Sequence, residues 1–450
     1  MKRLLLISAA VVTAVCAFAE APLKVGVYGD AGPSGMGAVD LMRWIDWSPE
    51  MELVVLTGAD VRNDALGTVD LVVLPGGSGS AYDSLGETGR AKFVAYLRNG
   101  GRCLATGSGA ALLAMPADGA DKCLGVIPYK SVGFLDHRLS LAPSVTTAGA
   151  AALGVPTGCD RILRYDGGPF LKAQSDGVEG ASFATWATYH SEINLTGRVS
   201  PNMFGSVAIA GGTLDDGKVV VFTHEPQYEY SKNSFIAGAI TWLTGRTVTI
   251  PQHAHVRGAV HVGLASDGIT LASIAPFVRA LDADSRFDLR PFDAIGARFE
   301  LLEHLDALVF PDGSDHAELV AGGISRALVT ETAAAGVKAF VWGSGANVLP
   351  LADAVTCTDA ADALEKLRAA FAPENDTATW TKPVKVESPL RVTIFGDNGP
   401  CGSNAHAWYR LINDSPEMTV TVASGYQIRN TDILDRTDLF LVPGGTISSI

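Results

Sequence analysis

Short, unbroken apolar runs recur along this chain, and each of them ends in a glycine turn. One run, Leu71–Leu74, leads into Pro75-Gly76-Gly77. A second run, Cys103–Thr106, leads into Gly107-Ser108-Gly109 and then into a further apolar stretch that begins at Ala110. Strands buried on both faces of a parallel sheet have this continuous apolar pattern. We therefore predict two parallel strands, the second of which passes through a sharp turn into a helix.

The same order of segments occurs again later in the chain. Pro311 and Gly343 are separated by the same number of residues as Pro75 and Gly107. A third copy begins at Leu390–Asn430, which aligns without a gap with the start of the first copy. In that copy the equivalent of the second turn would fall beyond the end of the sequence. The repetition predicts a tandem array of α/β units whose third unit is incomplete.

Changes in composition and periodicity divide the chain into segments. Between the second turn and the next strand, residues 118–201 contain many glycines and prolines and show no strong period, which suggests an insertion. The expected segments are a signal peptide at 1–19, a first unit at 23–246 that includes the insertion 118–201, a second, smaller unit at 259–372, a linker at 373–389, and the start of a third unit at 390–450.

The first residues have the order of a secretory leader. Lys2 and Arg3 precede an apolar run from Leu4 to Phe18, and Ala17-Phe18-Ala19 has the small-x-small pattern of a cleavage site, with cleavage after Ala19. A membrane anchor is the alternative, but the run is short for a membrane span. We therefore expect a secreted or periplasmic protein without a membrane span.

The net charge, the cysteines and the histidines bear on which ligands the protein could bind. The formal net charge is −14, which argues against nucleic-acid binding because that function needs a basic surface. Cys123 and Cys159 could pair in an oxidising compartment. His253, His255 and His261 have metal-like spacing but lie near a linker without an acidic partner. We expect neither a metal nor a cofactor.

Several segments of the first unit together resemble one known family. They are, in chain order, Leu74–Gly77, Gly100-Gly101, the turn at Gly107, Tyr165–Phe170, Ala184–Tyr189, Gly217–Phe222, His224 and Trp242–Gly245. This order is similar to that of the amidotransferase-like N-terminal domain of biotin–protein ligases, a branch of the class I glutamine amidotransferases. The resemblance covers about residues 23–246 and is partial afterwards. It implies flavodoxin-like three-layer αβα sandwiches in tandem, and no biotin-ligase catalytic domain is visible.

The resemblance also locates the catalytic positions of that family. An active member has a cysteine at the tip of the turn, where this chain has Gly107 and, in the second unit, Gly343. The family's His-Pro-Glu is replaced by His224-Glu225-Pro226, and successive strand residues point to opposite faces. Glu225 would therefore orient His224 poorly. Without a thiolate, the thioester route is closed.

The backbone N–H groups that the family uses in its site do not depend on the missing side chains. The family resemblance implies an oxyanion hole formed by backbone N–H groups, and such groups at a helix start attract anions. We therefore predict that a small anion binds in the first unit and that Asp312 and Asp315 repel it in the second. The predicted ligand-binding residues are Gly76, Gly77, Gly107, Ser108 and His224.

Three functions remain open from the sequence. The first is a secreted, non-catalytic amidotransferase-like protein that binds a small anionic ligand or a protein partner. The second is a divergent amidase or hydrolase in which Ser108 is the nucleophile, His224 is the base and Glu225 or Glu192 assists. The third is a purely structural unit of an array. The direction of the Ser108 hydroxyl, toward His224 or into the helix, distinguishes the first two.

Overall fold

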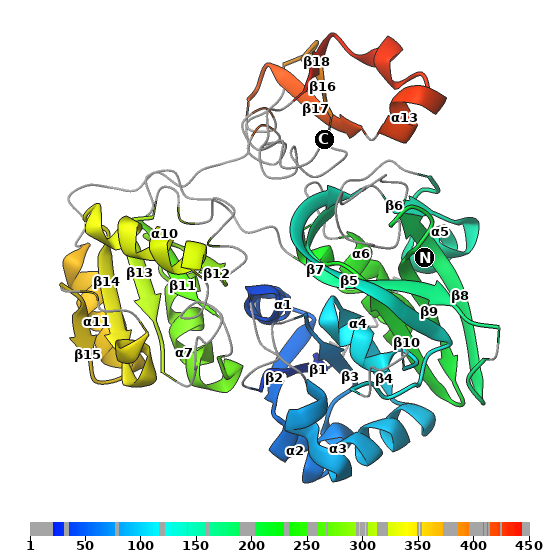
Figure 1. The fold of residues 1–450 in the computed structure, drawn as a ribbon, viewed down its shortest axis with the longest axis horizontal. Coiled ribbons are helices and arrows are strands. Elements are labelled where there is room, and N and C mark those ends of the chain that lie inside the picture. Colours follow the sequence, from blue (N-terminus) through cyan, green and yellow to red (C-terminus); the bar gives the residue numbers. More distant parts are fainter. Residues whose placement is uncertain are drawn as a thin grey trace, which may run out of the picture.

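The protein, in a computed structural model, contains three β-sheets that follow one another along the chain (Figure 1). The structure describes residues 21–442 with gaps. The longer gaps are 31–35, 77–80, 117–121, 159–162, 190–202, 229–233, 251–259, 313–322, 372–385 and 396–407. We call the three parts the first, second and third units, with the residue ranges given above. All three are α/β structures, and their sheets are mainly parallel, as the sequence predicted.

The first unit has a parallel sheet at its centre. Its strands are β1 (Leu23–Tyr28), β2 (Met51–Leu56), β3 (Leu71–Leu74), β4 (Arg102–Thr106) and β10 (Gly217–Phe222), in the order β2-β1-β3-β4-β10. Successive residues point to opposite faces. Leu71 and Val73 lie in one apolar core, whereas Val72 lies in the other. The continuous apolar run of β3 therefore reflects burial on both faces.

Helices cover both faces of this sheet and make three layers. On one face lie α1 (Met36–Trp47) and α6 (Ser234–Thr244), which contribute to the first core. On the other face lie α3 (Ala81–Arg98) and α4 (Ser108–Leu113), with the short α2 (Gly58–Arg62) and η1 (Ala65–Thr68) beside them. Thr57 caps α2 through a capping box with Asp60, which explains where this helix begins.

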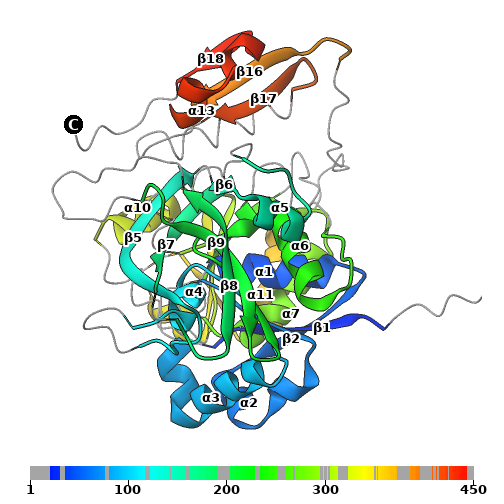
Figure 2. The ribbon, with the colours of Figure 1, turned by 90° about the vertical axis from the view of Figure 1, so that its right-hand side faces the viewer.

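Much of the segment 118–201, which its composition indicated to be an insertion, is regular structure that joins the sheet. Its strands join the first sheet beyond β10, mostly in antiparallel pairs, which Figure 2 shows from the side. The elements are β5 (Tyr129–Leu141), β6 (Pro143–Val145), α5 (Thr147–Leu153), β7 (Leu163–Ala173) and β8 (Ala181–Tyr189), followed by β9 (Val207–Leu214). Register shifts between Ser131 and Gly133, and between Leu135 and Arg138, break the alternation that sequence analysis relies on.

The second unit repeats the parallel sheet without the antiparallel extension. Its sheet has the order β12-β11-β13-β14-β15, and these neighbouring strands all run parallel. The elements are β11 (Val260–Ala265), α7 (Leu271–Asp282), β12 (Phe287–Phe292), β13 (Ala307–Phe310), α10 (Gly323–Ala334), β14 (Lys338–Trp342), η3 (Gly343–Asn347), β15 (Val355–Cys357) and α11 (Ala360–Ala370).

The third unit contains the smallest sheet, with the order β17-β16-β18 and parallel pairing (Figure 1). Its elements are β16 (Leu390–Phe395), β17 (Met418–Ala423), α13 (Gly425–Asn430), η5 (Ile433–Arg436) and β18 (Leu439–Leu441). One hydrogen bond occurs in all three units. In each, an aspartate just before the unit's third strand in chain order accepts it from a backbone N–H of the unit's first strand. These bonds are Lys24 to Asp70 (2.9 Å), His261 to Asp306 (2.8 Å) and Arg391 to Asp438 (2.9 Å).

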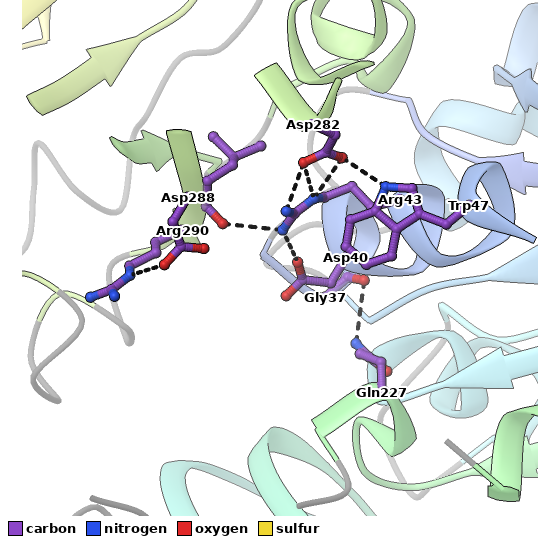
Figure 3. Close-up of polar contacts among 9 residues, drawn as sticks. Gly37, Asp40, Arg43, Trp47, Gln227, Asp282, Asp288 and Arg290 are labelled. Atoms are coloured by element: carbon purple, nitrogen blue, oxygen red, sulfur yellow. Dashed lines mark hydrogen bonds and ion pairs between the residues drawn. The ribbon is translucent and has the colours of Figure 1, made fainter. Parts of the chain in front are cut away.

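A buried ion pair joins the first unit to the second. Arg43 of α1 is 5% exposed and donates to both oxygens of Asp282 on α7, at 2.8 to 3.1 Å (Figure 3). It also reaches Asp40 on its own helix and the backbone oxygen of Leu289 in the second unit. Trp47 donates to Asp282 as well, at 3.2 Å. Because α1 also packs on the first sheet, it connects that sheet to the second unit.

Candidate functional site

The turn between β4 and α4 has the backbone geometry that the sequence predicted. Gly107 lies at this turn with φ 47° and ψ −122°, and Gly343 at the end of β14 has φ 55°. A positive φ strains any residue with a Cβ, so glycine is the residue that tolerates this turn. The sharp strand–turn–helix therefore survives in both units, but neither glycine offers a side chain for chemistry.

The side chain of Glu225 fills the space above Gly107. A Cβ placed on Gly107, or on Gly76 opposite, would collide with Glu225 Oε1. The carboxylate is buried and accepts hydrogen bonds from Thr106 Oγ1 at 3.0 Å and Gln227 Nε2 at 2.7 Å. The place where an amidotransferase would carry its nucleophile is thus occupied by a carboxylate of this chain.

The sheet explains how Glu225 arrives there. Strand β10 runs parallel to β4, with Phe222 opposite Thr106, so the residues after β10 lie beside the turn. The N–H of Gly107 donates to the backbone oxygen of His224 at 3.3 Å, which ties the two strand ends together. Gln227 also donates to the backbone oxygen of Gly37 at 3.3 Å (Figure 3). The site therefore extends to the start of α1.

His224 lies in the core, away from the position that a catalytic base would need. Its side chain is fully buried against the rings of Phe222 and Tyr189, and Nδ1 shares a 2.9 Å hydrogen bond with the Tyr189 hydroxyl. Within the described part of the chain, Nε2 has no hydrogen-bond partner. Burial lowers the pKa of His224 to about 3, so the imidazole is neutral at physiological pH.

The predicted ligand-binding residues are only partly brought together. The Gly76 N–H, which we expected to face an anion, instead donates to Thr106 Oγ1 at 3.0 Å, because that hydroxyl lies between it and Glu225. Gly77 lies outside the described residues, as do Asp315, Glu192 and Cys159. Ser108 is half-buried at the first position of α4, and no hydrogen bond joins it to the His224 ring. The serine–histidine pair of the hydrolase hypothesis is therefore not formed.

Sequence reasoning missed Thr106 and Gln227, the two side chains that hold the carboxylate. Thr106 was considered only as the last residue of the predicted second strand, and Gln227 was not considered. Gln227 lies in a short 3-10 helix, Pro226–Tyr228, so the alternation of a strand does not predict the direction of its side chain. The contact of both residues with Glu225 depends on β10 lying next to β4.

The second unit places a carboxylate at its own turn by a different route. Asp312, in the loop after β13, accepts a hydrogen bond from the backbone N–H of Ser344 at 2.8 Å. A Cβ on Gly343 would collide with this side chain. In the first unit the carboxylate comes from the residues after β10, whereas in the second unit it comes from the loop after β13, the strand that corresponds to β3. The two units therefore reach the same arrangement from different positions in the repeat.

The described residues also bear on metal binding and on membrane insertion. Among the described residues, no group of three or more His, Cys, Asp or Glu side chains is placed to hold a metal ion. None of the helices described combines the length and the apolar character that a membrane span requires. Both findings concern only this part of the chain.

Comparison with known proteins gives distant similarities only. No family model matches the chain, and no curated protein sequence matches it. A cytoplasmic protein from Salmonella typhimurium LT2 aligns over 50% of this chain and 98% of its own, with 12% identity and a TM-score of 0.33. A thua-like protein from Bacteroides uniformis aligns over 51% and 95%, with 11% identity and a TM-score of 0.37. A β-galactosidase from Rahnella sp. R3 aligns over 52% and 32%, with 14% identity and a TM-score of 0.33.

Proposed function

We propose that this chain is an exported, non-catalytic protein with an amidotransferase-like first unit, and that it works by binding a protein partner. The observation that carries this proposal is the position of Glu225. Its carboxylate lies where a side chain on Gly107 would have to be, and it is held there by Thr106 and Gln227. The site therefore has neither a nucleophile nor space for one.

The environment of His224 supports the same proposal. A general base works best when its pKa is near the working pH. Burial lowers the pKa of His224 to about 3, and its Nδ1 is engaged by Tyr189. Ser108 has no hydrogen bond to this ring. No observation in the site favours the serine-dependent hydrolase.

A protein partner is favoured over a small anion for a steric reason. An anion entering above Gly107 would collide with the side chain of Glu225, which already occupies this space. The Gly76 N–H that could have bound the anion already donates to Thr106. In the second unit the side chain of Asp312 occupies the corresponding space above Gly343.

The test is an activity and binding assay on the mature protein. We expect no hydrolysis of glutamine or of simple esters, and no saturable heat on titration with acetate or L-glutamate. The matched variant Glu225→Ala removes the carboxylate and should allow weak acetate binding. Turnover that disappears in Ser108→Ala would overturn the proposal in favour of the hydrolase. Saturable acetate binding by the unaltered protein would overturn the choice of a partner over an anion.

Export is the part of the proposal that rests on sequence alone. Residues 1–19 have the order of a secretory leader and lie outside the described residues. Intact-mass measurement of the protein recovered from the periplasm or medium should give a chain that begins at residue 20. A recovered protein that still carries Met1 would contradict cleavage.

A further inference from the structure

The two helices that join the first and second units hold equivalent places in the repeat. Helix α1 follows the first strand of its unit, and α7 follows the first strand of the second unit. Arg43 and Arg279 are separated along the chain by the same number of residues as the two glycine turns, and so are Asp46 and Asp282. The same arginine and the same aspartate therefore occupy equivalent positions on the two helices.

The ion pairs between these helices exchange the two positions. Arg43 of α1 pairs with Asp282 of α7 at 2.8 Å. In turn, Arg279 of α7 pairs with Asp46 of α1 at 2.7 Å. The contacts between helix and strand are exchanged in the same way, because α1 contacts β12 of the second unit and α7 contacts β2 of the first. Such an exchange of positions is the defining feature of a two-fold interface between identical subunits.

The first unit itself contains an equivalent of each group of the second unit to which Arg43 donates. Those groups are the carboxylate of Asp282 and the backbone oxygen of Leu289 (Figure 3). The equivalent positions in the first unit are Asp46 and Leu53, a residue of β2. Arg43 and Asp46 are three residues apart on α1, so they lie on the same face of the helix. That face is therefore complementary to a copy of itself, in which each Arg43 would meet the Asp46 of the other copy.

We propose that the α1 face with Arg43 and Asp46 is a homotypic docking surface, which the second unit covers and to which a second copy of this chain can bind. The second copy docks α1 against α1 about a two-fold axis. The second unit takes this place in the single chain because its docking is intramolecular, which gives it a higher effective concentration than a separate molecule. The inference goes beyond the proposed function, since neither Gly107 nor Glu225 takes part in it.

Reversing one charge on α7 tests this inference in the full chain. Asp282→Arg sets an arginine against Arg43 and should release α7 from α1, because a buried charge that loses its partner strongly destabilises a contact. The α1 face is unaltered in this variant, whereas α7 then carries two arginines and cannot pair with a copy of itself. We expect sedimentation velocity to give a dimer dissociation constant at least tenfold below that of the unaltered chain.

Two double variants identify the surface that the dimer uses. Adding Asp46→Arg to Asp282→Arg leaves α7 released but places arginines against each other across the two-fold axis, so the dimer should be lost. Adding Arg43→Asp instead restores an ion pair between α1 and α7 within the chain, so the chain should return to the behaviour of the unaltered protein. Amide exchange of β4 and β14 should stay unchanged in every variant, which shows that both units remain folded.

Three results would overturn the inference. The first is no gain of dimer in Asp282→Arg, and the second is a dimer that survives the addition of Asp46→Arg or of Arg43→Asp. The third is association that accompanies a loss of amide protection in β4 or β14, because the dimer would then arise from unfolding. Turnover of glutamine or of an ester, which would refute the proposed function, leaves this inference standing.

Discussion

Replacing Gly107 with alanine tests the central feature of the first unit, namely that a carboxylate occupies the nucleophile position. The change adds a single methyl group. That methyl meets two obstacles, because φ is 47° at this position and Glu225 Oε1 lies where the new Cβ would be. Glycine is thus required both by the backbone and by the neighbouring side chain.

The expected cost has two parts. An alanine in a sparsely populated backbone region costs on the order of 1–3 kcal/mol. Moving the carboxylate breaks at least one of its hydrogen bonds, to Thr106 at 3.0 Å or to Gln227 at 2.7 Å. A hydrogen bond to a charged group is worth roughly 1.5–3 kcal/mol. Gly107→Ala should therefore destabilise the first unit by roughly 2.5–6 kcal/mol, a large share of the stability of a typical domain.

Native-state amide exchange is the suitable assay because it reports on each unit separately. Protection of the amides of β4 and β10 should fall, whereas β14 in the second unit provides an internal reference. Gly154→Ala is the matched control, since Gly154 has φ 67° but no atom near its would-be Cβ. That variant should cost only about 1–2 kcal/mol, the penalty for a left-handed backbone.

A double-mutant cycle with Glu225→Ala isolates the collision from the strain. In that background Gly107→Ala should cost only the backbone term, so the two changes should be coupled by on the order of 2–3 kcal/mol. If Gly107→Ala costs no more than Gly154→Ala, or costs the same with and without Glu225, the carboxylate does not occupy the nucleophile position and the reasoning fails.

Three further predictions concern the core of the first two units. Arg43→Ala leaves the carboxylate of Asp282 buried without its main partner and should lower the free energy of unfolding by about 3–5 kcal/mol, measured by calorimetry. The control Arg279→Ala breaks a more exposed ion pair between the same two helices and should lower it by less than about 1 kcal/mol. The pKa of His224 is about 3 in the folded chain, whereas in the unfolded chain this imidazole takes up a proton near pH 6.5. The free energy of unfolding should therefore fall by up to about 1.4 kcal/mol per pH unit as the pH is lowered from 6.5 toward 3. His224→Gln should flatten this slope in urea titrations. Burial raises the pKa of the Cys103 thiol, so iodoacetamide at pH 8 should label it only after unfolding, and labelling of the folded protein would contradict the buried β4.

The sequence predicted the parallel part of the fold well because those strands are buried on both faces. β3 and β4 are short continuous apolar runs, and the repeat of the same segments in the later units reinforced them. The antiparallel extension was missed for a physical reason. β5 and β7 contain glycine, proline and register shifts, and such strands lose the alternation that marks an ordinary half-buried strand.

The site was predictable in its backbone but not in its side chains. The positive φ of Gly107 follows from a glycine at a strand–turn–helix junction. His224 and Glu225 contact different partners, as the sequence predicted, but both lie after the end of β10 at Phe222, so strand alternation does not account for their directions. The meeting of Glu225 with Gly107 depends on β10 lying beside β4, which are distant in sequence. Local pattern carries no information on that pairing.

A carboxylate lies beside the glycine turn in both of the first two units. Backbone N–H groups at the start of a helix need an acceptor, whether or not a reaction takes place there. In the second unit Asp312 accepts from the Ser344 N–H, and in the first unit Glu225 lies above Gly107. The two carboxylates come from different positions in their units. A cysteine at Gly107 should not support thioester chemistry, because Glu225 would have to leave first.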